Sequence, residues 1–216
     1  CDDDYIYGGV FNLDTNKPLN HQAEQWPHFK GGFSEYCYLF PGTYVWKVPE
    51  DMPGEVAALL DPCAVAMRAV EQVMTSIGGT GEGFSLTSRC VVIGAGAISI
   101  MTAMILKSMG AKQVIITDFF DEKLAKAKEI ANVDITVNVA KMTSEERVAK
   151  ILELTDGGAE VVINGANHPS TCVEGLQMVR KLGYYVEIGN ALDFGRGLKS
   201  EINIPLVVFE RNAHIT

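Results

Sequence analysis

The sequence predicts an α/β fold in which a doubly wound parallel sheet follows part of a small β-rich domain. In residues 86–216, short apolar runs alternate with segments whose apolar side chains recur every three to four residues, as strands and amphipathic helices do. A glycine-rich turn, Gly94-Ala95-Gly96, stands where the first of these strands passes into a helix. Residues 1–85 carry 4 basic and 12 acidic side chains, and the rest carry 14 and 15, so two different segments are expected.

Composition limits the classes of protein to consider. The chain has 216 residues, 47% of them hydrophobic and 21% charged, and a formal net charge of −9. It can therefore bury a large core, and the acidic balance argues against a nucleic-acid partner, because phosphate backbones are bound by clustered Lys and Arg. No run approaches the roughly 20 apolar residues of a membrane-spanning helix. We expect a cytoplasmic protein with reduced cysteines and, since it begins with Cys1 and three aspartates, a fragment of a longer protein.

The second part of the chain is expected to alternate strands with helices. Apolar runs predict strands at 89–94, 113–117, 135–138, 160–164, 184–188 and 214–216. Periodicity predicts helices at 98–109, 122–131, 144–154, 170–182 and 205–211. Because a helix lies between consecutive strands, the strands are expected to run parallel.

Capping residues and apolar faces define these helices. The expected caps and turn residues are Gly110 after the first helix, Asp121 before the second, Thr143 with Glu146 before the third, Gly183 after the fourth and Pro205 opening the last. The apolar face expected for the first helix is Ile98, Met101, Thr102, Ile105 and Met109, and for the fourth Val173, Leu176, Val179 and Leu182.

The first part of the chain has a different pattern. Residues 31–40 and 44–48 are expected to be antiparallel strands around Pro41-Gly42, and a helix beginning at Glu55 is expected to be interrupted by Pro62 and to resume over 64–75. The glycine-rich residues 78–83 suit a flexible link. We therefore assign residues 1–54 to a β-rich domain and 55–216 to a dinucleotide-binding domain that ends within its sixth strand.

The segment Gly94-Ala-Gly96-Ala97-Ile98-Ser99 is expected to bind phosphate. Glycines at a strand-to-helix turn let the backbone approach a pyrophosphate, and the helix N-terminus offers free N–H groups. Ser99 stands where the usual third glycine packs the helix against the strand. The alternative is an ordinary glycine-rich turn.

Asp118 strengthens the dinucleotide interpretation. It lies 24 residues after Gly94, at the end of the second predicted strand, where a carboxylate accepts from the hydroxyls of an adenosine ribose. Lys123 is placed to reach the same ribose. Because Asp118 would repel a 2′-phosphate and Phe119 and Phe120 follow it in place of an arginine, NAD is favoured over NADP. The alternative is that Asp118 only caps the next helix.

These segments together resemble the medium-chain dehydrogenase/reductase family, which includes zinc alcohol, sorbitol and threonine dehydrogenases. The resemblance covers nearly the whole chain and rests on residues 31–36, 48–50, 57–62 and 92–98, on Asp118 with Lys123, and on Ile188-Gly189. It implies a GroES-like domain before the Rossmann domain. It further implies that Ile98 lies against the cofactor and that Ile188, Gly189 and Asn190 line the nicotinamide.

The resemblance also implies zinc as a second cofactor. Asp61 matches an acidic residue before proline in the sorbitol and threonine dehydrogenase branch, so it is expected to be a direct or water-mediated zinc partner in catalysis. The alternative is a helix cap beside Pro62. Cys1 resembles the last of four cysteines of a structural zinc lobe, or is a plain exposed thiol. Cys63 is expected to be a buried helix cysteine.

The histidines add little: surface exposure is favoured for His21 and His28, and a loop position without catalytic duty for His168. The favoured hypothesis is an NAD-dependent, zinc-assisted oxidoreductase that transfers a hydride between a secondary alcohol or polyol, or the matching ketone, and nicotinamide. The alternatives are a nucleotide-binding module without turnover and a zinc-free enzyme like the quinone reductases. The resemblance implies a homo-oligomer.

Overall fold

The computed structural model describes residues 11–12, 17–18, 35–39, 42–74, 84–189, 201–203, 205 and 213–215. The chain divides into two compact units, Cys1–Met52 and Pro53–Thr216. In the first unit, β1 (Phe11–Asn12) and β2 (Lys17–Pro18) pair as antiparallel strands. Within the described ranges, no helix is both long enough and apolar enough to cross a membrane.

The antiparallel strands expected at 31–40 and 44–48 are wrong where the structure describes them. Residues 35–39 and 42–50 adopt no strand. Tyr36, Tyr44 and Trp46 are 76%, 84% and 72% exposed, so no apolar layer formed by the described residues covers their side chains. A two-stranded ribbon needs such a layer for stability, and the described residues of this unit do not supply one.

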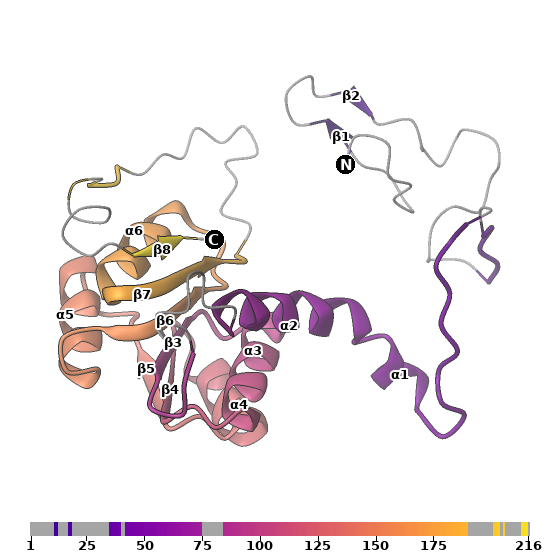
Figure 1. Cartoon of the computed structure of the whole chain (residues 1–216), viewed down its shortest axis with the longest axis horizontal. Helices are drawn as coiled ribbons and strands as arrows, with labels where there is room; N and C mark the ends of the chain where they lie inside the picture. The colour runs from indigo at the N-terminus through magenta and orange to yellow at the C-terminus, as the bar shows by residue number, and fades with distance from the viewer. Residues whose placement is uncertain are drawn as a thin grey trace. The chain divides into compact units, whose positions relative to one another are not determined.

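The second unit contains a six-stranded parallel sheet in the order β5-β4-β3-β6-β7-β8 (Figure 1). The strands are β3 (Arg89–Ile93), β4 (Gln113–Asp118), β5 (Ile135–Asn138), β6 (Ala159–Asn164), β7 (Val179–Glu187) and β8 (His214–Ile215). The order begins at β3, runs outward to β5, and then returns through β6 to the opposite edge. This is the doubly wound Rossmann arrangement, as predicted.

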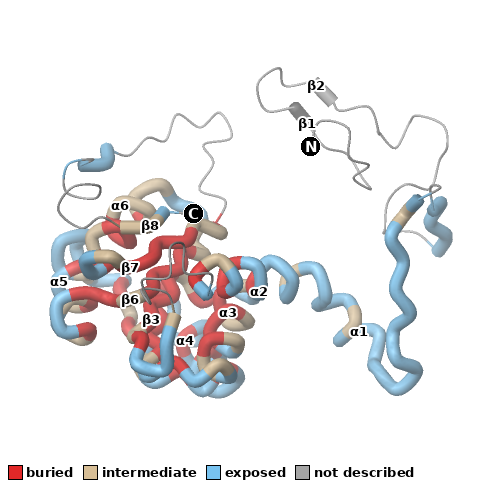
Figure 2. Tube along the Cα trace, viewed as in Figure 1, coloured by how far each residue is buried: buried red, intermediate tan, exposed pale blue. Residues whose placement is uncertain are grey.

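Helices cover both faces of the sheet. They are α2 (Leu60–Met74), α3 (Ala97–Ser108), α4 (Asp121–Ala131), α5 (Ser144–Leu154) and α6 (Pro169–Met178); the short helix α1 (Gly54–Ala57) precedes them and has no buried residue. One buried cluster joins the sheet to α2, α3 and α4, and a second joins its other face to α5 and α6. Figure 2 shows the resulting buried layer between the two sets of helices.

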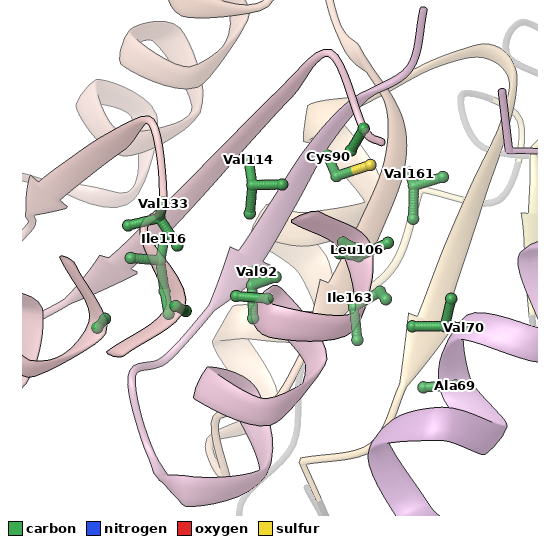
Figure 3. Packing of buried hydrophobic residues seen from close by; sticks show 14 of the residues in the cluster. Ala69, Val70, Cys90, Val92, Leu106, Val114, Ile116, Val133, Val161 and Ile163 are labelled. Carbon is green, nitrogen blue, oxygen red and sulfur yellow. The ribbon is translucent and has the colours of Figure 1, made fainter. Parts of the chain in front are cut away.

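Side chains of each central strand alternate between these two clusters, because successive residues of a strand point to opposite faces. Cys90 and Val92 of β3 belong to the first cluster, and Val91 and Ile93 to the second. Figure 3 shows Val92 together with Val114, Ile116, Val161 and Ile163 from the neighbouring strands, facing Leu106 of α3 and Val70 of α2.

The apolar face predicted for the first helix is rotated from the observed one. The buried residues of α3 are Ser99, Thr102, Ala103 and Leu106. Of the predicted set only Thr102 is among them; Ile105 and Met109 are partly buried against the same cluster. Helix α3 packs between α2 and α4, so its flanks are covered too, and apolar periodicity alone could not single out the face toward the sheet.

The helix predicted over 170–182 ends earlier, at Met178. Val179 already pairs with Ala159 of β6, and the register shifts before Val161 pairs with Tyr184. Leu182 takes up the irregularity with a left-handed φ of 59°. The spacing of Val179 and Leu182 fits a helix equally well, so pairing with β6 decided the boundary.

Proline does not interrupt the helix before the sheet. Pro62 lies in the first turn of α2, where a missing N–H costs nothing, and the break between α1 and α2 falls at residues 58–59. Cys63 is exposed, contrary to expectation. It is on the first turns of α2, whereas only the later residues Ala66, Ala69, Val70 and Val73 are buried (Figure 2).

Four of the predicted capping residues can be compared directly with the structure. Gly110 follows Met109, the C-cap of α3, with a left-handed φ of 85°, as predicted, whereas Gly183 lies within β7 and ends no helix, because α6 stops at Met178. Thr143 and Glu146 form the predicted capping box of α5. Asp121 is not a cap: Phe120 occupies the N-cap of α4, and Asp121 accepts a hydrogen bond from Asn138 Nδ2 at 2.6 Å. The link at 78–83 lies outside the described residues, as does the helix at 205–211 apart from Pro205.

Candidate dinucleotide site

The site lies at the carboxyl edge of the sheet between β3 and β6, where the strand order reverses and doubly wound folds bind ligands. Gly94 opens the turn from β3 to α3. It has a φ of +88°, and a Cβ there would lie 3.3 Å from the backbone nitrogen of Ala166. A left-handed turn and a close approach to the loop after β6 both require glycine here.

Neither the backbone conformation nor packing against other protein atoms explains why residue 96 is a glycine. It is the N-cap of α3 with an ordinary φ of −78°, and a Cβ would meet no atom within 4 Å. The helix has no side-chain cap, and Gly96 and Ala97 are exposed. The first turn of α3 therefore offers N–H groups beside open space that a side chain at Gly96 would fill, which fits a pyrophosphate.

Asp118 lies beside this turn. Its Oδ2 accepts from the Ala95 backbone N–H at 2.8 Å and its Oδ1 from that of Phe120 at 3.0 Å. The carboxylate is thus fixed by the glycine-rich turn on one side and by the start of α4 on the other. Each oxygen can accept a further hydrogen bond, so the group is suited to two neighbouring hydroxyls.

Lys123 is exposed on the first turns of α4, and its Nζ lies 5.0 Å from the centre of the Phe120 ring. Ile98 is half-buried at the start of α3. The structure therefore brings Gly94, Gly96, Ala97, Ile98 and Asp118 to one edge of the sheet.

A cavity of about 60 Å³ adjoins Asp118, and it contains a feature that the sequence did not predict. Arg147 of α5 lines it and forms an ion pair with Glu174 of α6 at 3.1 Å. The Arg147 guanidinium also lies 4.9 Å from the centre of the Phe119 ring. No local pattern signals this arrangement, because three separate connections of the sheet contribute to it.

A hydrogen-bonded network holds the other end of the site. Glu187, the last residue of β7, accepts from Asn164 Nδ2 at 2.9 Å, from the Gly189 backbone N–H at 2.9 Å and from the Tyr185 hydroxyl. Burial is the largest cause that raises the pKa of Tyr185 above its usual value, and the hydrogen bond to Glu187 is the second. The phenol therefore remains a donor. The turn Ile188-Gly189, expected to line the nicotinamide, is fixed by this carboxylate.

Gly189 is also tightly enclosed. A Cβ there would overlap the backbone of Ala166, so the loops after β6 and β7 touch at this glycine. Asn190 lies outside the described residues. His168 is the N-cap of α6, where its Nδ1 accepts from the Ser170 N–H at 3.3 Å.

The residues expected to bind zinc are not brought together by the described chain. Asp61 is exposed in the first turn of α2, and Cys1 lies outside the described residues. Among the described residues no group of three or more His, Cys, Asp and Glu side chains is placed to hold a metal ion. The described residues do not form a zinc site by themselves.

The fold is a doubly wound α/β sheet, and the candidate site lies at the strand reversal where such folds bind dinucleotides. A family model described as zinc-binding dehydrogenase matches residues 97–215, more than half of the chain. The chain belongs to this zinc-binding dehydrogenase family.

Individual relatives agree with this assignment. The sorbitol dehydrogenase of Mus musculus is 29% identical over 170 residues, which are 79% of this chain and 43% of that one. The structure of an alcohol dehydrogenase from Thermotoga maritima aligns with a TM-score of 0.77 at 26% identity, covering 92% of this chain and 52% of that one. A short chain alcohol dehydrogenase from Escherichia coli CFT073, complexed with NADH, aligns with a TM-score of 0.69 at 25% identity, over 86% and 49%. The chain spans about half of these proteins or less.

Proposed function

We propose that this chain is the cofactor-binding part of an NAD-dependent, zinc-assisted oxidoreductase acting on a secondary alcohol or polyol. The observation that carries the proposal is the Asp118 carboxylate, which is hydrogen-bonded to the Ala95 amide next to the uncapped N-terminus of α3. A ribose acceptor and a pyrophosphate cradle thus stand side by side at the strand reversal. The NADH complex of the Escherichia coli relative supports a nicotinamide cofactor.

The charges around Asp118 favour NAD over NADP. A 2′-phosphate there would meet the Asp118 carboxylate and, in the adjoining cavity, Glu174. Arg147 is the guanidinium that lines this cavity, and its charge is already neutralised by Glu174 at 3.1 Å. A ribose hydroxyl, by contrast, can donate to Asp118.

The substrate class follows from the relatives and not from the geometry. Relatives named sorbitol dehydrogenase support a polyol or alcohol. Nicotinamide, when bound, accepts or donates the hydride, and this chain's contribution would be to orient it through Gly96, Asp118 and the Ile188-Gly189 turn. Asp61 would supply one oxygen to zinc, whose other ligands would come from residues that the structure does not describe or from outside these 216 residues.

The experiment is a fluorescence titration of the 216-residue chain with NADH and NADPH. We expect at least a tenfold preference for NADH, which Asp118→Ala should narrow. Asp121→Ala is the matched control, because Asp121 is an exposed carboxylate in the first turn of α4 and should leave the preference unchanged. Equal affinities of the wild type for both cofactors would overturn the NAD assignment.

A nucleotide-binding module without turnover is the second candidate, favoured by one observation, the lack of a metal-ligand cluster among the described residues. Sequencing the rest of the natural gene decides between the two. A cysteine and a His-Glu pair upstream would support the oxidoreductase.

A further inference from the structure

We propose that Arg147 is a specificity-determining residue, whose Nε donates a hydrogen bond to a ring nitrogen of the purine base of the bound dinucleotide. The proposal rests on the proposed function, since it takes the cofactor to lie at the carboxyl edge of the sheet. No local sequence motif indicates Arg147, and the proposed contact is a single hydrogen bond donated by its Nε.

The cavity beside Asp118 suits the edge of a flat, uncharged ring. Apolar side chains form much of its lining, contributed by Ile93, Phe119, Val139, Ile151, Ala166 and Met178. Asp118 also lines it, so a group in the cavity is adjacent to the carboxylate expected to hold the ribose. Phe119 is 47% exposed and offers a ring face at this place.

The guanidinium of Arg147 is only partly satisfied. Its Nη1 lies 3.1 Å from Glu174 Oε1, and its Cζ lies over the Phe119 ring, 4.9 Å from the ring centre. Its Nε is buried and has no hydrogen-bond partner among the described residues. A buried donor without a partner is costly, and a ligand acceptor that reaches it recovers that cost.

Charge selects the kind of acceptor. Arg147 and Glu174 neutralise each other, and Asp118 leaves the cavity with a net negative charge, so an anionic group such as phosphate is disfavoured. A purine ring supplies uncharged acceptors at N1, N3 and N7 and a flat face to stack. These are the properties that the unpaired Nε and the Phe119 ring require.

The test uses ligands in which one acceptor at a time is removed. NADH bound to the 216-residue chain is displaced with AMP or with its 1-deaza, 3-deaza or 7-deaza analogue, and the loss of bound NADH is measured by its fluorescence. We expect one analogue to bind at least fivefold more weakly than AMP to the wild type. Arg147→Lys keeps the positive charge beside Glu174 but removes Nε, so it should weaken AMP at least fivefold and leave that analogue no weaker than AMP.

Arg180→Lys is the matched control, because Arg180 also pairs with a glutamate, Glu160, at 3.4 Å, but does not line this cavity. It should leave all four affinities unchanged. Circular dichroism checks folding of each variant; if Arg147→Lys does not fold, the wild-type series still overturns the proposal when all three analogues bind as AMP does.

Two results overturn the proposal. In the first, the wild type binds all three analogues with the same affinity as AMP. In the second, the weaker binding of one analogue relative to AMP persists in Arg147→Lys. Either result, with NADH still bound by the wild type, leaves the proposed function standing. A wild type that does not bind NADH overturns both.

Discussion

The side chain of Ser99 in α3 occupies the space that a Cβ on Gly165 would need, and the two residues face each other where α3 meets the loop after β6. Ser99 is 1% exposed. It stands where dinucleotide-binding turns commonly carry a third glycine for close packing of the helix. In this chain the glycine is on the opposite side of the contact.

Gly165→Ala should therefore destabilise the fold by roughly 1–3 kcal/mol, because the added methyl group overlaps Ser99 Oγ in a closed site. Ser99→Gly alone should cost about 1 kcal/mol of helix stability and leave NADH affinity within a few-fold. The double variant should be more stable than the sum of the two changes predicts. Urea denaturation measures all four proteins, and strictly additive effects would contradict the contact.

Gly96→Val should abolish NADH binding while the sheet remains folded. The backbone at Gly96 has a φ open to any residue, and the new side chain meets no protein atom at Cβ, so only the ligand's space is lost. Gly54→Val is the control, since Gly54 is equally open but lies in α1. Calorimetric titration with circular dichroism is the measurement; wild-type affinity in Gly96→Val would mean that the glycines form only a turn.

Glu187→Gln should lower the free energy of unfolding by roughly 1–3 kcal/mol, because an amide cannot accept from all three donors that the carboxylate satisfies. It should also weaken NADH more than AMP, since the Gly189 turn is proposed to contact only the nicotinamide end. Glu160→Gln is the control: Glu160 is also a partly buried strand carboxylate, which accepts from the Arg89 N–H at 2.7 Å. An equal loss of NADH and AMP affinity in Glu187→Gln would contradict its positioning role.

The 216 residues alone should bind zinc weakly and should not oxidise alcohols when zinc is added. Asp61 supplies one carboxylate, and the described residues contain no group of three candidate ligands. Zinc calorimetry and NAD reduction with a panel of polyols are the measurements. Zinc-dependent oxidation would show that a complete site exists within these residues, and Asp61→Asn would then test its location.

Strands with continuous apolar runs were predicted closely because local pattern and burial agree in them. β5 has the predicted bounds, and β3, β4 and β6 differ from prediction by one residue. The boundary of α6 was missed because Val179 and Leu182 suit a helix until β6 offers hydrogen bonds. The strands expected at 31–40 and 44–48 do not form where the structure describes these residues, because a strand pattern gives a sheet only where something covers its apolar face.

The sequence by itself determined the alternation of strands and helices, the glycine-rich turn and the placing of Asp118 at the end of β4, since each depends on neighbours within about two dozen residues. Only the tertiary structure decided that Gly165 makes room for Ser99, that Glu187 holds the Gly189 turn and that Arg147 and Glu174 meet beside Asp118. The physical reason is that these contacts join loops and helices from separate crossovers of the sheet, and their side chains meet only once the parallel strands have brought their carboxyl ends to one edge.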